Sequence, residues 1–293
     1  MAEAGRDVTF LVRPKRAAEL AAAGLIVKSR YGDIAIEAPQ TVRTGTIGST
    51  FDLVLLSCKA YDLEGAMEAF TPAVGEGTAI LPLLNGMRHL DLLNARFGAE
   101  RVLGGECFIA ATLNERREIV HLSEQHGLTF GEIETAGSER TREIEALMDG
   151  AKFEGRASGA ILLDMWEKWV FLATLAGSTC LMRASVGDIL AADGGAAFVT
   201  GLSEECRAIA ESRGFTPRQA NVDKVLAALT APGSPLTASM MRDIENNFPV
   251  EADHIVGDLL QRGNADGLLS PRLQIVYSHL KTYEARRARL ASA

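Results

Sequence analysis

Two near-continuous apolar runs, Asp52–Ser57 and Thr78–Leu83, constrain the fold of this chain more than any other feature. Runs of this kind are typical of strands that are buried on both faces of a parallel sheet. The stretch between them, Leu63–Phe70, has helical spacing, and parallel neighbours require a crossover of this kind. We therefore predict an α/β domain built on a doubly wound sheet.

Further elements follow from the same patterns. In the first half we expect helices at Lys15–Ala23 and His89–Phe97, and strands at Val8–Val12, Leu25–Lys28, Ile34–Glu37, Val102–Gly104, Cys107–Leu113, Glu118–His121 and Leu128–Phe130. Helical spacing alone recurs later, at Leu162–Met182, Gly194–Ser212, Pro217–Leu229, Leu236–Asn246, Glu251–Gln261 and Pro271–Arg289. The chain is thus expected to divide into a sheet domain, residues 1–153, and an all-α domain, residues 154–293, with a substrate in the cleft between them.

Composition narrows the function. A net charge of −8 argues against a nucleic-acid binder, which needs a basic face. The four cysteines lie far apart and predict a reducing, cytoplasmic compartment without a disulfide framework. The most apolar stretch, Ala160–Met182, carries Asp164, Glu167 and Lys168, so we expect a buried core helix and no membrane partner. The histidines have no metal-ligand spacing, so we expect no metal.

The beginning of the chain has the pattern of a dinucleotide-binding unit that is entered midway. Residues 2–7 resemble the end of a helix with Gly5 as its stop, and Val8–Val12 resembles the second strand of such a unit. The first strand and its glycine-rich phosphate turn are expected just before, and this sequence does not contain them. We expect a start codon set too far downstream, with a degraded copy as the alternative.

Three polar residues follow predicted strands at their carboxyl ends, where parallel sheets bind ligands. Arg13 occupies the place where an arginine favours NADP and an acidic residue favours NAD. Lys59 is placed to meet a phosphate or the nicotinamide ribose. Asn85 lies beside Gly86, which allows the backbone to approach a ligand closely. The simpler interpretations are a surface arginine, a solvated loop lysine and an Asn-Gly turn.

Three more candidates lie in the helical half. Lys168 stands in a strongly apolar helix, where burial moves a lysine pKa toward the range of a general acid. The alternative is a lysine that snorkels to solvent or pairs with Asp164. Ser239 opens a helix and could bind a carboxylate or simply cap that helix. Glu251 opens the next helix, where an acidic residue is a common dipole partner.

Together these positions resemble the ketopantoate reductase (2-dehydropantoate 2-reductase) family over nearly the whole chain. The resemblance rests on Val12-Arg13, Cys58-Lys59-Ala60, Leu84-Asn85-Gly86-Met87, Trp166-Glu167-Lys168, Ser239-Met240-Met241-Arg242-Asp243-Ile244-Glu245, and Glu251 with Asp253. It implies a Rossmann-like NADP-binding domain, an all-α C-terminal domain for substrate and homodimer contacts, and reduction of a 2-keto acid on the route to pantothenate.

The resemblance also implies residue roles. Lys168 would be the general acid that protonates the forming alkoxide, and Glu251 would hold the substrate hydroxyl and tune that lysine. Ser239 would bind near the substrate carboxylate. The contacts to NADPH would come from Arg13, Lys59 and Asn85, and Asn85 would also touch the substrate. The chemistry agrees, because hydride attack on a ketone creates negative charge on oxygen and a buried lysine supplies both charge and proton.

Two departures from the family pattern keep alternatives open. The glycine-rich turn, whose amides hold a pyrophosphate, is missing. The family also usually has an asparagine one helical turn after the lysine and another a turn later, where this chain has Leu172 and Ala176. The alternatives are therefore a paralogous oxidoreductase for a different 2-keto acid, and a non-catalytic homologue that acts as a helical dimer without binding nucleotide.

Overall fold

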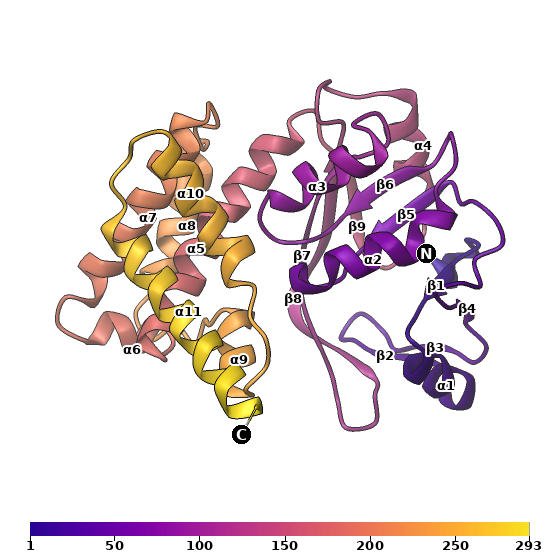
Figure 1. Cartoon of the computed structure of the whole chain (residues 1–293), viewed down its shortest axis with the longest axis horizontal. Helices are drawn as coiled ribbons and strands as arrows, with labels where there is room; N and C mark the ends of the chain where they lie inside the picture. Colours follow the sequence, from indigo (N-terminus) through magenta and orange to yellow (C-terminus); the bar gives the residue numbers. More distant parts are fainter. Residues whose placement is uncertain (293) are drawn as a thin grey trace. The chain divides into compact units, whose positions relative to one another are not determined.

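Figure 1 shows the computed structural model of the chain, which describes residues 1–292. Contacts group these residues into two compact units. The sheet unit holds Met1–Cys58, Asp62–Leu84 and Leu92–Ile161, and the helical unit holds Lys59–Tyr61, Asn85–Asp91 and the chain from Leu162 onward. All described strands precede residue 158, and helices alone follow. The predicted fold class, an α/β half followed by an all-α half, is confirmed.

Two pairs of parallel strands carry the first part of the sheet unit. Strand β1 (Thr9–Leu11) pairs with β4 (Gln40–Val42), and β5 (Leu53–Leu56) pairs with β6 (Ala79–Pro82). The accompanying helices are α1 (Pro14–Ala23), α2 (Leu63–Phe70) and α3 (Arg88–Phe97). Among the described residues the two pairs are separate sheets. Strand β4 is unexpected from the sequence because its three residues are short of apolar side chains and largely exposed.

The chain enters β1 as its sequence pattern predicts. Ala2–Ala4 form a short 3-10 turn, and Gly5 ends it in the left-handed conformation with φ 81°. Glycine adopts this conformation without the steric cost that a Cβ would add. The first residues therefore do form the end of a helical turn that leads into a strand.

A third sheet completes the unit in the order β3 (Ile34–Ile36), β2 (Leu25–Lys28), β8 (Ile119–Gly131) and β7 (Gly104–Leu113), with β9 (Glu154–Ala157) beside β8. The expected β2–β3 hairpin is confirmed. Strands β7 and β8 form one long hairpin with a bulge between Ile109 and Ala111, where the sequence predicts shorter strands. Helix α4 (Glu139–Leu147) packs Ile144 on the core residues Leu103 and Phe130.

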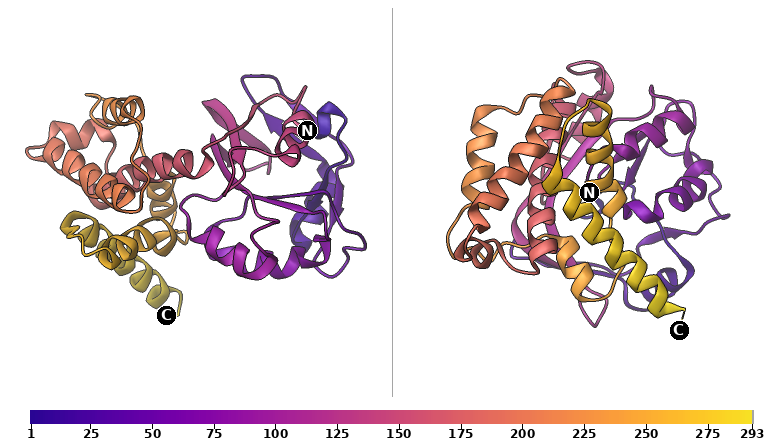
Figure 2. Two further views of the ribbon diagram at one scale, coloured as in Figure 1. Left: turned by 90° about the horizontal axis from the view of Figure 1, so that it is seen from above. Right: turned by 60° about the vertical axis from the view of Figure 1, so that its left-hand side comes forward.

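The helical unit is built around α5 (Ile161–Met182). Gly177 of this helix has no room for a side chain, because a Cβ would lie 2.8 Å from Leu202 and 3.4 Å from Val276. These neighbours belong to α7 (Gly195–Ser212) and α11 (Pro271–Ala291). Figure 2 shows the helices of this unit, coloured from pink to yellow, from two further sides. The other helices are α6 (Val186–Ala191), α8 (Gln219–Leu229), α9 (Ser239–Glu245) and α10 (Asp258–Ala265).

One segment of the helical unit departs from regular α-helix. The predicted helix Glu251–Gln261 is present from Ala252 onward, but it begins with a π-helical turn, η4 (Asp253–Gly257), that leads into α10. In this turn the amide of Asp258 donates to the carbonyl of Asp253, five residues back. Such turns are rare and occur often at functional sites.

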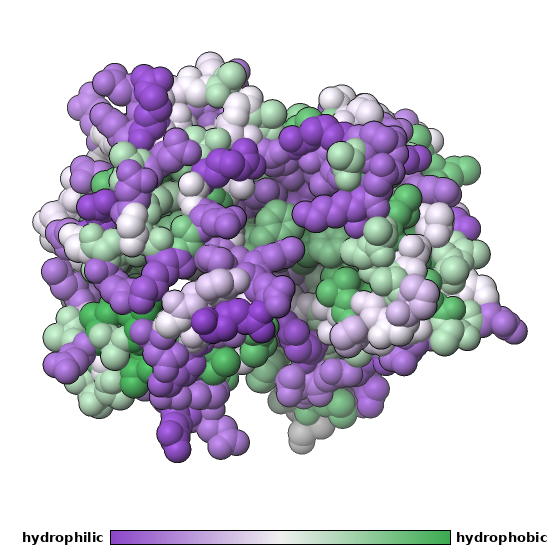
Figure 3. Space-filling view, turned by 180° about the vertical axis from the view of Figure 1, so that it is seen from behind, coloured by the Kyte–Doolittle hydropathy of each residue, from purple (hydrophilic) through white to green (hydrophobic). Residues whose placement is uncertain are grey.

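The most apolar helix belongs to the core, as predicted. Trp166 and Trp169 of α5 are 2% and 1% exposed. In residues 1–292, every helix is too short or too polar to cross a membrane. Polar and apolar residues are interspersed over the face of the molecule in Figure 3.

Candidate active site

Arg13 lies at the carboxyl end of β1, as the sequence predicts, and it is the N-cap residue of α1. Its side chain is 78% exposed, and its Nη2 donates to Asp62 Oδ1 at 2.7 Å. An exposed pair of this kind contributes little to stability because water and salt screen it. The guanidinium is therefore a solvent-accessible cation that a phosphate group could reach.

Lys59 and Glu251 meet in the helical unit although they lie far apart in the chain. Lys59 Nζ donates to Asp243 Oδ2 at 2.9 Å and to Glu251 Oε2 at 3.3 Å, while the amide of Ala60 donates to Glu251 Oε1 at 2.9 Å. Burial lowers the pKa of Lys59, but the charge of Glu251 and the hydrogen bond to Asp243 outweigh it, so that this pKa is raised. Glu251 thus holds the turn that follows β5, a role beyond that of a helix-dipole partner.

Lys168 is buried in the middle of α5, with 7% of its surface exposed. The interpretation of a lysine that snorkels to solvent is therefore wrong. The neighbouring carboxylate of Glu167 accepts from Arg218, whose Nη2 lies 2.7 Å from Oε2, and Arg218 also pairs with Asp164. These two carboxylates raise the pKa of Arg218. The segment of α5 around Lys168 thus contains two buried carboxylates that both pair with Arg218.

Asn85 and Gly86 form a tight turn after β6 that packs on His254. Gly86 has φ 80°, and a Cβ at this position would lie 2.8 Å from the carbonyl oxygen of His254. His89, three residues later, places Nδ1 3.2 Å from His254 Nε2, and both imidazoles are buried. The sequence pattern does not predict this pair, whose only signal is a histidine in the segment that continues the Asn-Gly turn.

Both imidazoles favour the neutral form. Burial, the charge of His254 and the charge of Lys168 hold the pKa of His89 well below its ordinary value. Burial and the charges of Arg88 and Arg262 lower the pKa of His254 to about 4, although a hydrogen bond to the Asn85 backbone opposes them. In a neutral pair one ring donates the hydrogen bond and the other accepts it.

Ser239 is the first residue of α9 and is exposed. Ala238 is the N-cap residue and makes no side-chain cap hydrogen bond, so the interpretation of Ser239 as a cap is wrong. The same short helix carries Asp243, the partner of Lys59. The hydroxyl of Ser239 therefore lies on α9, the helix that is ion-paired to Lys59 in the turn after β5.

Leu172 and Ala176 follow Lys168 at helical spacing on α5, one and two turns later. Leu172 is half-buried, and Ala176 is 3% exposed. The face of α5 that continues from the lysine is thus apolar and lacks the amides expected from the resemblance.

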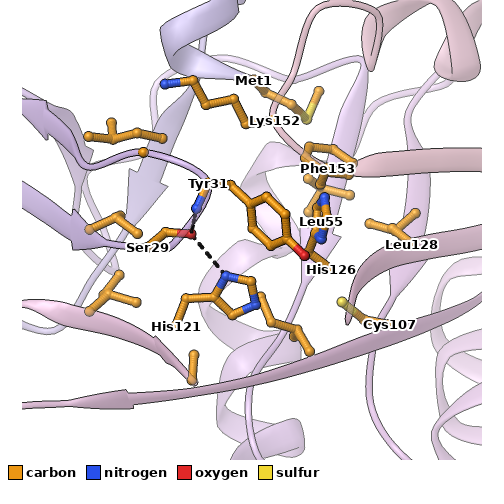
Figure 4. A pocket seen from close by; sticks show the side chains of 16 residues that line it. Met1, Ser29, Tyr31, Leu55, Cys107, His121, His126, Leu128, Lys152 and Phe153 are labelled. Atoms are coloured by element: carbon orange, nitrogen blue, oxygen red, sulfur yellow. Dashed lines mark hydrogen bonds between the residues drawn. The ribbon is translucent and has the colours of Figure 1, made fainter. Parts of the chain in front are cut away.

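A cavity of about 310 Å³ lies in the sheet unit (Figure 4). Apolar side chains of β2, β7 and β8 line much of it. Tyr31 packs against His121 and His126, and Ser29 Oγ lies 3.0 Å from His121 Nδ1. None of the predicted site residues lines this cavity.

Family models match both halves of the chain. A family model described as ketopantoate reductase PanE/ApbA matches residues 1–135, and the corresponding C-terminal model matches residues 160–284. An uncharacterized oxidoreductase of Bacillus subtilis, YkpB, is 37% identical over 98% of this chain and 94% of its own length. The crystal structure of 2-dehydropantoate 2-reductase from Geobacter metallireducens has a TM-score of 0.87 at 31% identity, covering 96% of this chain and 93% of that one.

A more distant likeness concerns the fold alone. The structure of D-mandelate dehydrogenase with NADH and anilino(oxo)acetate has a TM-score of 0.84 at 18% identity and covers 98% of this chain and 94% of that one.

Proposed function

Because the chain belongs to the ketopantoate reductase (PanE/ApbA) family of oxidoreductases, we propose that it reduces a 2-keto acid with NADPH. The first candidate substrate is 2-dehydropantoate, reduced to pantoate for pantothenate synthesis. One observation carries this proposal: a lysine buried in an apolar helix, Lys168, belongs to the same compact unit as Asn85, Ser239 and Glu251. These residues come from four separate segments of the chain.

The residues present supply part of an NADP site. Arg13 offers an exposed guanidinium at the carboxyl end of a parallel strand, and this group binds phosphate in a bidentate manner. Lys59 has a raised pKa and offers a second cation after β5. The backbone at Asn85 and Gly86 offers a close approach after β6. A glycine-rich turn for the pyrophosphate is not among residues 1–292, so no residue is assigned to that group.

NADPH, when bound, supplies the hydride. As the C2 carbonyl of the keto acid is reduced, negative charge develops on its oxygen. In our proposal the ammonium of Lys168 stabilises that charge and donates a proton to the oxygen, which yields the 2-hydroxy acid. The attraction between the ammonium and the forming alkoxide is stronger in a buried site than in water, because water screens the two charges less.

Glu251 and Ser239 orient the substrate in this proposal. Each carboxylate oxygen of Glu251 already accepts one hydrogen bond, from Lys59 or from Ala60. A carboxylate oxygen has about two acceptor positions, so Glu251 retains capacity for a substrate hydroxyl. The hydroxyl of Ser239 is not used as a helix cap, and we assign it to the substrate carboxylate.

Steady-state oxidation of NADPH in the presence of 2-dehydropantoate tests the proposal. We expect Lys168→Met to lower kcat by at least about 100-fold, the lower end of the range for general acid catalysis, while NADPH affinity is kept. Lys224→Met, which removes an exposed lysine of the same unit, is the matched control and should retain full turnover. Parental turnover in Lys168→Met would refute the proposed mechanism.

A second candidate substrate is a different 2-keto acid with an apolar side chain. The observation that favours it is the apolar face of α5 formed by Leu172 and Ala176. Sites built for a polar group discriminate strongly against analogues that lack it. Comparing kcat/KM for 2-dehydropantoate with that for branched and aromatic 2-keto acids separates the two. The variant Leu172→Asn should shift the ratio toward 2-dehydropantoate.

The remaining alternative is a helical homodimer without catalysis. Titration of the chain with NADPH, followed by nucleotide fluorescence, decides between it and the enzyme, since tight binding contradicts the alternative. We further propose a reducing, cytoplasmic compartment, because the four cysteines lie far apart in the sequence and form no disulfide framework pattern.

A further inference from the structure

One short segment, Glu251–Ile255, holds both of the turns that follow β5 and β6. Glu251 binds the first turn through the side chain of Lys59 and the amide of Ala60. His254 binds the second turn, because its carbonyl and ring lie against Gly86 and it hydrogen-bonds to the backbone of Asn85. Two turns that carry proposed ligand-binding residues therefore share one anchor.

Both ends of the second turn, residues 85–89, contact the same residue, His254. His254 contacts Asn85 and Gly86 at the beginning of residues 85–89, and His89 at their end. His89 Nδ1 and His254 Nε2 are 3.2 Å apart. The two rings are stacked, with centroids 5.4 Å apart and an angle of 24° between their planes. The intervening residues cannot shift without breaking one of these contacts.

The anchor is itself fixed on both sides. The indole Nε1 of Trp169 donates to the carbonyl of Ile255 at 2.8 Å, and Trp169 is adjacent to Lys168 on α5. Asp253 accepts from Tyr277 and Lys281 of α11 at 2.7 and 3.0 Å. The π-helical turn is thus tied to the lysine helix and to α11.

We propose that His89 and His254 are positioning residues that hold the Asn85–Gly86 turn in register with Lys168. This inference rests on the proposed reductase function, because it assigns the turn a task in catalysis. The neutral state of the pair fits the role: burial first, and then the charges of Arg88, Arg262 and Lys168, lower the pKa values of the two imidazoles. A neutral pair can keep the hydrogen bond between its rings at neutral pH.

Three variants test the inference. His254→Leu removes the hydrogen-bonding nitrogens, whereas His254→Gln keeps an amide near the position of Nε2. We expect His254→Leu to lower kcat/KM by about 10- to 100-fold, the cost of a misplacement of about 1 Å in a catalytic group. His254→Gln should recover most of that loss. His279→Leu alters a histidine of α11 outside this pair and should change nothing.

Hydrogen exchange of the amides in residues 85–89 gives a readout that does not depend on turnover. We expect at least about tenfold faster exchange in His254→Leu than in His254→Gln. Unchanged kcat/KM in His254→Leu, or no recovery in His254→Gln, overturns the inference. If the parent protein reduces no keto acid, the proposed function fails; equal exchange rates in the two variants would then still overturn the positioning role.

Discussion

Lowering the pH should destabilise the helical unit through His254. In the folded protein the pKa of this imidazole is lowered from 6.5 to about 4 by burial and by the charges of Arg88 and Arg262. The unfolded chain therefore takes up a proton near pH 6.5 that the folded chain refuses. The free energy of unfolding is therefore highest above pH ~6.5, and it decreases as the pH falls toward about 4, the pKa of His254 in the folded protein.

The magnitude follows from the gap between the two pKa values of His254, 6.5 and about 4. At about 1.4 kcal/mol per pH unit, the full effect is about 3 kcal/mol. Between pH ~7.5 and pH ~5, where few carboxylates titrate, about 2 kcal/mol of it should be lost. His89 acts in the same direction, because its pKa is also held well below the ordinary value.

Urea unfolding followed by tryptophan fluorescence measures this loss selectively. The two tryptophans of the chain, Trp166 and Trp169, are both buried in α5, so the signal reports on the helical unit. His254→Gln should lose much less stability over the same pH interval. His126→Gln, in the sheet unit, is the control and should follow the parent. An equal pH dependence in the parent and His254→Gln would refute the reasoning.

Two further predictions concern charged residues. Arg13→Glu should raise the Kd of NADPH by about 10- to 100-fold, the value of a lost charge-assisted hydrogen bond. The Kd of NADH should stay within about threefold. Equal weakening of both nucleotides in a fluorescence titration would contradict a phosphate contact. Arg218→Met leaves the buried carboxylates of Glu167 and Asp164 without this partner and should lower the free energy of unfolding by about 2 kcal/mol, less than for a fully buried pair because the guanidinium is half exposed. Arg207→Met, which breaks an exposed pair with Glu211, should change it by less than about 0.5 kcal/mol in the same urea titration.

The sequence predicts the strands that position the site better than the contacts within it. β5 and β6 are apolar along their length, and this pattern predicts parallel strands and the ligand-binding ends that follow them. The pairing is parallel as predicted and β6 is buried throughout, but β5 is only partly buried and its Leu55 is 41% exposed. β4 escapes prediction because Gln40-Thr41-Val42 has neither the length nor the apolar pattern of such a strand, and only its pairing with β1 orders it.

The side-chain partners of the site could not be predicted, because they join distant parts of the chain. Glu251 looks like an ordinary first-turn acid in its own helix, and its bond to Lys59 spans 192 residues. His89 and His254 are 165 residues apart and belong to no motif with metal spacing. Periodicity reports which face of an element is buried, but it does not report which buried polar group meets which.

One segment at the beginning of the π-helical turn holds two turns at once. In a regular helix, residues three apart such as Glu251 and His254 project from neighbouring positions on one face. Here the amide of Ile255 donates to the carbonyl of Glu251, as in an α-helix, and the wider turn follows from Asp253 to Asp258. Glu251 engages the turn after β5 and His254 engages the turn after β6. An insertion or deletion in residues 251–257 should therefore disturb both turns together, whereas a substitution at either anchor should disturb only its own.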